Sequence, residues 1–313
     1  MKTTPVTPAD LQRSVLAVPP LCRRADLALD EGETRKLVQH LRAGGVSTFM
    51  WGGNANLYNM GVGEFASFLD IAERLAGLDE WMIPSVGADF GKAADQLAIL
   101  RKRAFPTAMA LPLRFPSTPA GVARGLGLLA EKYGRPLIAY VKDDGYADAA
   151  DLAALVRDGS LCAIKYGTVR KDPTQDPALA ELLRRVDPAL VISGIGERPV
   201  IDHFGFGLRA FTSGCVSIAP RLSTAIRVAL QRGDKPTAAR LRALFLPLED
   251  LRDAHSALRV LHAAVKLAGI AETGPMDPFL SAIDDPGQLA AIRAAAQALR
   301  AENDRAPVAS AAQ

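Results

Sequence analysis

The chain has 313 residues, of which 49% are hydrophobic and 23% are charged, an ordinary composition for a globular protein with a sizeable core. Its 37 basic and 34 acidic side chains are interspersed and give a formal charge of +3, so we expect no nucleic-acid partner. No apolar run approaches the roughly 18 residues that a membrane-spanning helix needs, and we expect no membrane association.

The N-terminal residues do not resemble a secretory signal, because Asp10 and Arg13 interrupt the apolar run. The three cysteines, Cys22, Cys162 and Cys215, are odd in number, far apart and set in apolar surroundings. This pattern is typical of buried thiols in a reducing compartment rather than of a disulfide framework. We therefore expect a cytoplasmic protein.

Eight short apolar runs rich in Val, Ile, Leu and Phe follow one another along the chain, each succeeded by an amphipathic helical pattern. The predicted strands are residues 14–19, 47–51, 81–86, 107–111, 136–140, 161–165, 189–193 and 208–213. Eight alternating strand and helix units predict an α/β protein, a (β/α)8 TIM barrel rather than an open doubly wound sheet.

After the eighth unit the strand signals stop and only helical periodicity continues. We expect the barrel to occupy residues 1–232 and a C-terminal helical subdomain to occupy residues 233–303. Residues 304–313 contain few large apolar side chains, which is typical of a disordered tail.

The catalytic groups of an α/β barrel stand at the carboxyl ends of its strands, so polar residues that follow the apolar runs are the candidates. Tyr140 ends the fifth predicted strand and Lys165 ends the sixth, so the two side chains can converge on one pocket. Desolvation disfavours the ammonium form of a lysine and leaves the neutral amine available to attack a carbonyl carbon, while a phenol relays protons. The alternative is a lysine that reaches water beside a tyrosine with a satisfied hydroxyl.

Two glycine-containing segments also follow predicted strands. Gly52, Gly53 and Asn54 follow the second strand, where unhindered amides and an amide side chain could hold a carboxylate; a plain tight turn is the alternative. Gly194 follows the seventh strand in the run SGIGERP, which lacks the third glycine of a dinucleotide fingerprint, so we expect no nicotinamide cofactor. Glu197 of that run is interpreted as a carboxylate in the first turn of a helix, with a pocket acid as the alternative.

A metal site is not expected from the histidines and cysteines. The histidines fall in helical patterns without the spacing of metal ligands, and no two cysteines are close enough in the sequence to suggest zinc. The four histidines are His40, His203, His255 and His262.

The order of these strand-end residues resembles the dihydrodipicolinate synthase and N-acetylneuraminate lyase family, which comprises class I, lysine-dependent aldolases and dehydratases. The resemblance extends from residue 14 to residue 280. It implies that Lys165 forms a Schiff base with a 2-keto acid, pyruvate or a sugar-derived acid, that Tyr140 relays protons, and that no cofactor is needed. The segment FTSGCVSIAP resembles the family's eighth-strand segment, and we take Thr212 within it, with Gly194, as further substrate-binding candidates. The family also implies a homotetramer.

The departures from the family pattern indicate a divergent member. Where the family has Gly-Thr-Thr-Gly-Glu, this chain has GGNAN, so the hydroxyls that contact the keto-acid carboxylate are missing. Arg114, a further substrate-binding candidate, and Phe115 stand near the place where a neighbouring subunit's tyrosine would complete the relay. The loop after Tyr140 lacks the family's arginine, and Asp143 and Asp144 would repel a carboxylate if they faced the pocket.

The sequence therefore predicts a lyase of the Schiff-base type, without distinguishing aldol cleavage from dehydration. A catalytically silent barrel that binds a keto acid is the alternative from another class, and a nicotinamide-dependent oxidoreductase is a third that the sequence disfavours. Dihydrodipicolinate synthase proper is also disfavoured, because that reaction must hold a second carboxylate.

Overall fold

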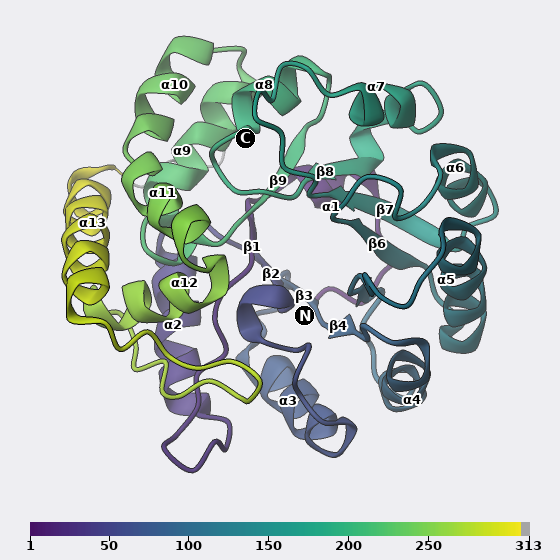
Figure 1. Ribbon diagram of the computed structural model, residues 1–313, viewed down its shortest axis with the longest axis horizontal. Coiled ribbons are helices and arrows are strands. Elements are labelled where there is room, and N and C mark those ends of the chain that lie inside the picture. The colour runs from purple at the N-terminus through teal and green to yellow at the C-terminus, as the bar shows by residue number, and fades with distance from the viewer. Residues whose placement is uncertain (308–313) are drawn as a thin grey trace. The chain divides into compact units, whose positions relative to one another are not determined.

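The computed structural model describes residues 1–307. Its strands and helices alternate along the chain, and the fold is a (β/α)8 TIM barrel with additional C-terminal helices, which confirms the predicted fold class (Figure 1). The chain divides into two compact units. The first unit comprises Met1–Arg13, Gly61–Ile195 and Asp202–Thr212, and the second comprises Ser14–Met60, Gly196–Ile201 and the chain from Ser213 onward.

The strands of the first unit follow the predicted apolar runs. They are β3 (Trp81–Ile83), β4 (Ser85–Val86), β5 (Met109–Ala110), β6 (Leu137–Val141), β7 (Leu161–Tyr166), β8 (Val191–Ser193) and β9 (Ala210–Ser213), whose last residue belongs to the second unit. From β4 to β9 each strand pairs in parallel with the next. The predicted strand 81–86 is divided at Pro84, because proline has no amide hydrogen to donate to a neighbouring strand.

All but one of the helices of the first unit begin at the polar and proline signals expected from the sequence, the exception being the helix that begins at Val62. The helices of this unit are α1 (Pro8–Gln12), α3 (Val62–Leu75), α4 (Phe90–Leu100), α5 (Pro119–Tyr133), α6 (Ala149–Arg157) and α7 (Pro177–Leu183), with the short helix η2 (Pro188–Leu190). Asp89, Thr118 and Asp176 each accept a hydrogen bond from an amide in the first turn of the helix that follows. Figure 1 shows α5 and α6 on the outer side of β6 and β7. All five residues of β6 are buried, so this part of the sheet belongs to the core.

The second unit combines a parallel strand pair with the C-terminal helices. Its strands are β1 (Leu16–Ala17) and β2 (Thr48–Met50), and Leu16 is the register partner of Thr48. Its helices are α2 (Glu31–Ala43), α9 (Pro220–Gln231), α10 (Lys235–Ala243), α11 (Leu246–Ala254), α12 (Ala257–Leu267) and α13 (Pro286–Arg305), with the short helices η1 (Gly53–Ala55) and η3 (Cys215–Ser217). Helix α8 (Val200–Gly205) begins in the second unit and ends in the first.

The predicted subdomain boundary at residues 232 and 233 falls between α9 and α10, and the division into barrel and helical subdomain stays a prediction. Helix α13 extends to Arg305, two residues into the segment 304–313 that the sequence predicts to be a tail. Residues 308–313 of that segment lie outside the described part of the chain.

The three thiols are free, as the sequence predicts. Cys22 and Cys215 are buried and Cys162 is partly buried, and burial raises the pKa of Cys22 to about 12 and that of Cys162 to about 11. Within residues 1–307 no helix is both long and apolar enough to cross a membrane. The same residues contain no group of three or more metal-ligating side chains.

Candidate active site

Lys165 and Tyr140 lie together in the first unit. The two residues are register partners on the neighbouring parallel strands β7 and β6. Both are buried, with exposed fractions of 4% and 8%, and the Lys165 Nζ lies 4.2 Å from the centroid of the Tyr140 ring. The sequence-based expectation that the two side chains converge therefore agrees with their geometry.

Two glycines make room for this pair. A Cβ atom on Gly194, which follows β8, would lie 3.0 Å from the Lys165 Cγ and 2.6 Å from the Tyr166 carbonyl oxygen. A Cβ atom on Gly167, which follows β7, would lie 2.6 Å from the Tyr140 Cε2. These distances are shorter than an ordinary carbon contact. At Gly194 the near atom is a backbone oxygen, so this position requires glycine, whereas a side chain at Gly167 would displace the Tyr140 ring. Gly194, predicted to bind substrate, thus packs against the stem of Lys165.

A second lysine approaches the same tyrosine. Lys142, one residue beyond the end of β6, places its Nζ 5.7 Å from the centroid of the Tyr140 ring. The negative face of an aromatic ring attracts cations at this distance. Tyr140 is therefore in contact with two lysines, of which Lys165 is the nearer.

Thr212, on β9, is buried, with an exposed fraction of 2%. Its hydroxyl donates to the Ser193 carbonyl oxygen at 3.4 Å, and the Ser193 hydroxyl lies 2.8 Å from the His203 Nδ1. Both hydroxyls therefore contact groups of the protein. The predicted role of Thr212 in substrate binding stays a prediction.

Arg114 contacts Asp143, one of the two aspartates that the sequence analysis expects to repel a carboxylate substrate if they face the pocket. Its Nε donates to the Asp143 carboxylate at 2.5 Å, and its Nη2 donates to the other carboxylate oxygen of Asp143. The pair is solvent-exposed, with 65% of the Arg114 side chain accessible. The Asp143 charge is therefore compensated, and the role of Arg114 in substrate binding stays a prediction.

A second arginine, Arg170, was not singled out from the sequence. Its guanidinium donates to both oxygens of the Asp144 carboxylate, at 2.5 and 2.6 Å, and lies 2.9 Å from Asp176. Asp176 also accepts the Tyr166 hydroxyl at 2.8 Å and is completely buried. The guanidinium holds the pKa of Asp144 below its usual range. The sequence signals for this cluster are Asp144 in the loop after Tyr140 and a basic residue five positions after Lys165, and neither of them indicates the pairing.

The glycine segment after β2 belongs to the second unit. Gly52 precedes the short helix η1, and Gly53 opens it. The Asn54 Nδ2 donates to the Val18 carbonyl oxygen at 2.9 Å, and the His262 Nε2 lies 2.8 Å from the Asn54 carbonyl oxygen. A Cβ placed on Gly53 would be in ordinary contact with the Tyr58 Cε2, at 3.6 Å, so the Tyr58 ring lies beside this backbone. The binding of a carboxylate by Gly52, Gly53 and Asn54 stays a prediction.

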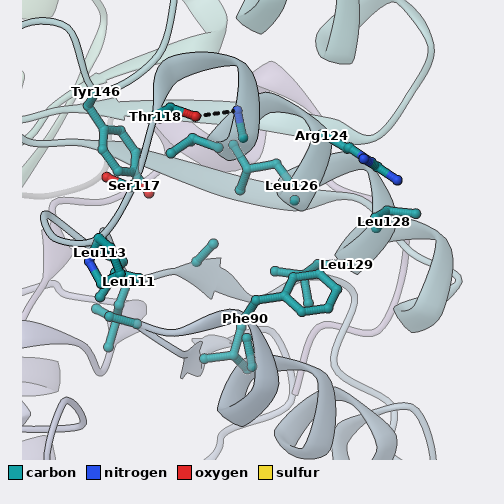
Figure 2. A pocket seen from close by; sticks show the side chains of 18 of the residues that line it. Phe90, Leu111, Leu113, Ser117, Thr118, Arg124, Leu126, Leu128, Leu129 and Tyr146 are labelled. Carbon is teal, nitrogen blue, oxygen red and sulfur yellow. Dashed lines mark hydrogen bonds between the residues drawn. The ribbon is translucent and has the colours of Figure 1, made fainter.

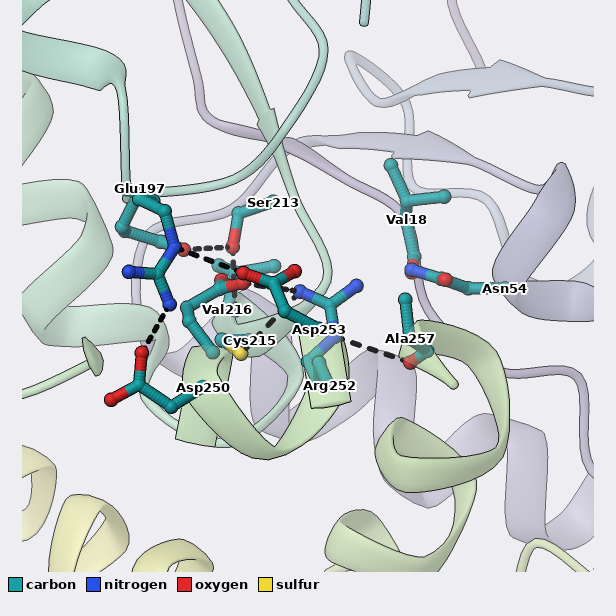
Figure 3. A network of polar contacts seen from close by, with 12 residues as sticks. Val18, Asn54, Glu197, Ser213, Cys215, Val216, Asp250, Arg252, Asp253 and Ala257 are labelled. Atoms are coloured by element: carbon teal, nitrogen blue, oxygen red, sulfur yellow. Dashed lines mark hydrogen bonds and ion pairs between the residues drawn. The ribbon is translucent and has the colours of Figure 1, made fainter. Parts of the chain in front are cut away.

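A buried polar network surrounds Glu197 in the second unit (Figure 3). Glu197 is completely buried and accepts the Ser213 hydroxyl at 2.8 Å and the Ser223 hydroxyl at 2.6 Å. Burial, followed by the nearby Glu249 carboxylate, raises the pKa of Glu197 to about 7. The interpretation of Glu197 as a first-turn helix carboxylate is wrong, because α8 begins only at Val200 and the carboxyl is enclosed by serine hydroxyls.

Beside Glu197, the carboxylate of Glu249 accepts two hydrogen bonds from the Arg252 Nη1, at 3.0 and 3.1 Å. Both side chains come from α11 and are buried. Neither residue was singled out from the sequence, where they look like part of an ordinary charged helix face. Their burial could not be predicted from that local pattern.

An apolar cavity of about 630 Å³ lies in the first unit, beside α4 and α5 (Figure 2). Phe90, Leu113, Leu126 and Leu129 contribute to its lining, with Tyr146 at one side. Neither Lys165 nor Tyr140 contributes to the lining. The volume is suitable for a small molecule, but no lysine that could form an imine is among the lining residues in the described part of the chain.

Comparison with known proteins gives both a sequence relative and structural relatives. No protein-family model matches the chain. A probable 5-dehydro-4-deoxyglucarate dehydratase 2 from Streptomyces coelicolor is 24% identical over 280 residues, which are 87% of this chain and 84% of that protein.

Among solved structures, the dihydrodipicolinate synthase from Oceanobacillus iheyensis matches with a TM-score of 0.82 and 19% identity, over 95% of this chain and 98% of that one. A prophage protein of the dihydrodipicolinic acid synthase family from E. coli K12, solved in complex with pyruvate, matches with a TM-score of 0.78 and 17% identity, over 91% of this chain and 98% of that one. The resemblance indicated by the sequence is thereby confirmed, and this chain has the fold of these proteins.

Proposed function

We propose that this chain is a class I lyase that forms a Schiff base between Lys165 and the C2 carbonyl of a 2-keto acid. The observation that supports the proposal most directly is the buried contact between Lys165 and Tyr140, with Nζ 4.2 Å from the ring centroid. A buried lysine beside a phenol at the carboxyl ends of parallel barrel strands has the nucleophile and the proton donor that carbinolamine chemistry needs.

The reaction begins when the neutral amine of Lys165 attacks the C2 carbonyl to give a carbinolamine. Tyr140 donates a proton to the departing hydroxyl, water leaves, and the imine nitrogen carries the positive charge. The protonated imine withdraws electrons from C3, which makes loss of a C3 substituent possible without a metal or organic cofactor. Hydrolysis of the final imine returns the free lysine.

The imine supports two outcomes. In a dehydration, the Tyr140 phenolate accepts a proton from C3 to give an enamine and returns it to the hydroxide that leaves C4 as water. In an aldol cleavage, the phenolate accepts the proton of the C4 hydroxyl, the C3–C4 bond breaks, C4 becomes a carbonyl and the electron pair enters the enamine, which a proton then quenches at C3. The 24% identical relative from Streptomyces coelicolor, named as a dehydratase of a sugar-derived keto acid, favours dehydration of such an acid as the first reaction to test. The pyruvate complex of the E. coli relative favours pyruvate as the first ligand.

Carboxylate binding by the amides of Gly52 and Gly53 and by Asn54 belongs to the same proposal, as do contacts from Arg114, Gly194 and Thr212. A cytoplasmic location and a homotetramer complete it. Light scattering of the purified protein tests the tetramer, and a molar mass that corresponds to a single chain would contradict it.

Hydride trapping tests the Schiff base. Purified protein is incubated with borohydride and a panel of keto acids that includes pyruvate and 5-dehydro-4-deoxyglucarate, and labelled peptides are mapped by mass spectrometry. We expect the label on Lys165 and none in the Lys165→Ala variant. Lys142→Arg is the matched control, because Lys142 also contacts Tyr140, and it should keep the label. Label on Lys142, or none with any keto acid, would contradict the proposal.

Turnover separates the lyase from the alternative of a silent keto-acid-binding barrel. If Lys165 is trapped but no member of the panel is dehydrated or cleaved, the silent barrel is the better description. Product formation from any member, lost in Lys165→Ala, supports the lyase. A nicotinamide-dependent oxidoreductase would instead require binding of the dinucleotide, which a fluorescence titration detects.

A further inference from the structure

We propose that Lys142 is a second cation of the Lys165–Tyr140 pair, which favours the uncharged amine of Lys165 and the phenolate of Tyr140. Lys142 acts through these two side chains and is not itself a catalytic residue. The proposal rests on the proposed function for its effect on turnover, whereas its effect on the charge of Lys165 can be measured without any substrate. All three residues belong to the first unit.

The three side chains lie on the same face of the sheet. Tyr140 and Lys165 are register partners on neighbouring parallel strands, so they point to one face. Lys142, two positions after Tyr140, returns to that face, as its contact with the Tyr140 ring requires. Tyr166, the next residue of β7, points to the opposite face, where its hydroxyl donates to Asp176 at 2.8 Å.

The Tyr140 ring brings two ammonium groups close together. The Lys165 Nζ lies 4.2 Å from the ring centroid and the Lys142 Nζ lies 5.7 Å from it. Because both distances end at the same point, the two nitrogens are at most about 10 Å apart, whichever face of the ring each occupies. Like charges at this separation repel, and burial adds its own cost to the ammonium form. Lys165 is buried and Lys142 is exposed, so we expect Lys165 to be the one that loses its proton.

The positive charge of Lys142 is not neutralised by the aspartates that follow it. Asp143 pairs with Arg114 and Asp144 pairs with Arg170. Lys142 itself takes part in no ion pair in the part of the chain that the structure describes. The other titratable groups of the elements that pack against β7 are Tyr166, Asp176 and His203 on the opposite face of the strand, Asp151 and Arg157 on α6, and Asp187 at the start of η2.

A second cation assists the proposed reaction at two steps. Attack on C2 requires the uncharged amine of Lys165, and repulsion from Lys142 increases the fraction of that form. The Tyr140 phenolate must then persist until it accepts a proton from the substrate, and an ammonium group 5.7 Å from the ring centroid stabilises this anion. Lys142 keeps its charge throughout because it forms no bond in the reaction, whereas the charge on the Lys165 nitrogen appears and disappears.

The test measures the charge of Lys165 directly. Short pulses of acetic anhydride acetylate only uncharged amines, and mass spectrometry of the digested protein gives the extent of reaction at each lysine between about pH 6 and about pH 11. We expect the midpoint for Lys165 to rise by about 0.3–1 pH unit in Lys142→Gln. This is the shift that Coulomb repulsion over about 10 Å gives for effective dielectric constants from that of water down to about 25.

Two variants serve as controls. Lys142→Arg keeps a cation at this position and should keep the midpoint for Lys165 within about 0.2 pH unit of the wild-type value, since the repulsion depends on charge. Lys132→Gln removes the same charge from an exposed position in the last turn of α5 and should also leave this midpoint unchanged.

The salt concentration tests the electrostatic origin of the shift. Because Lys142 is exposed, the difference between the wild-type and Lys142→Gln midpoints should shrink when the salt concentration is raised to about 0.5 M. A difference that does not respond to salt would contradict the proposal.

Turnover links the charge of Lys165 to the proposed reaction. Below the midpoint the uncharged fraction falls about tenfold for each pH unit, so Lys142→Gln should lower turnover at neutral pH by about 2-fold to 10-fold. Lys142→Arg should restore it, because a cation again stands beside the Tyr140 ring.

The outcomes distinguish the two proposals. If the midpoint for Lys165 does not rise in Lys142→Gln, or rises as far in Lys132→Gln, the role of Lys142 is overturned. A midpoint that rises in Lys142→Gln alone supports this role. If the midpoint rises in this way but no keto acid labels Lys165 in the hydride-trapping experiment, the proposed function fails and the electrostatic role of Lys142 stands.

Discussion

A Cβ atom on Gly167 would overlap Tyr140, because it would lie 2.6 Å from the ring Cε2 and 3.2 Å from the hydroxyl oxygen. The two residues stand at the ends of the neighbouring strands β7 and β6, and the Gly167 amide donates to the Val141 carbonyl oxygen at 2.7 Å. This hydrogen bond ties the backbone at Gly167 to β6. The absence of a side chain at 167 leaves the space that the Tyr140 ring occupies.

Gly167→Ala should displace the Tyr140 ring and lower turnover by about 10-fold or more, because a misplaced catalytic group loses rate steeply. Trapping of Lys165 by pyruvate should be affected less. Gly63→Ala is the control, since a Cβ there has no neighbour within 4 Å and the position lies in α3. Equal turnover in the two variants would show that Tyr140 does not need its observed position.

Tyr140→Phe should keep the packing of the ring and remove the hydroxyl that we propose as the proton relay. We expect turnover to fall by about 100-fold or more, the usual effect of losing a general acid or base, with a smaller change in substrate affinity. Steady-state kinetics separate the two effects. An unchanged turnover would assign the proton transfer to another group.

Glu197→Gln should change how stability depends on pH. Because burial raises the pKa of Glu197 from 4.5 to about 7, the folded protein holds a proton there that the unfolded chain has lost between these values. This proton stabilises the folded protein fully below pH 4.5, and the stabilisation is lost as the pH rises to about 7. The loss in the free energy of unfolding is on the order of 3 kcal/mol. Denaturant unfolding of both proteins between pH 4 and 8 measures the difference.

The difference between the two proteins is the appropriate measure, because His262 contributes with the opposite sign. Burial lowers the pKa of His262 to about 4, so its contribution is lost as the pH falls below 6.5. His262 is present in both proteins and cancels. If the wild-type and Glu197→Gln curves stay parallel, Glu197 does not hold the proton in the folded state.

We expect Arg170→Ala to lower the free energy of unfolding more than Arg114→Ala does, although each variant removes the arginine partner of an aspartate. Arg170 contacts Asp176, whose side chain is completely buried, so its removal leaves a buried carboxylate without its charged partner and should cost about 1–3 kcal/mol. Arg114 pairs with Asp143 at the surface, where such a pair contributes less than about 1 kcal/mol. Urea titrations of the two variants compare the costs, and an equal loss would contradict the assignment of Arg170 to a buried cluster.

The protein should not be an efficient dihydrodipicolinate synthase. That reaction condenses pyruvate with aspartate semialdehyde and needs a free cationic partner for a second carboxylate, but Arg114 and Arg170 are already paired with Asp143 and Asp144. A coupled reductase assay with both substrates measures the rate. A kcat/KM above about 10⁴ M⁻¹s⁻¹, which is ordinary for an enzyme on its own substrate, would refute this expectation.

The sequence by itself determined the strands and the order of the residues at their ends. Apolar runs bounded by turn signals are local features, and a parallel barrel brings successive strand ends together, so the contact between Tyr140 and Lys165 followed from their places in two neighbouring runs. The break at Pro84 is also local in origin, because it arises from the chemistry of one residue.

Only the tertiary structure decided which charged side chains are buried and which groups they meet. Glu249 and Arg252 have the spacing of an ordinary surface pair on a helix, and nothing in that spacing indicates that both are buried beside Glu197 or that Arg252 approaches Asn54. Burial and pairing of this kind depend on segments separated by about two hundred residues. The spacing of apolar residues shows which face of a helix or strand is apolar. The packing of the elements determines which group a charged side chain meets.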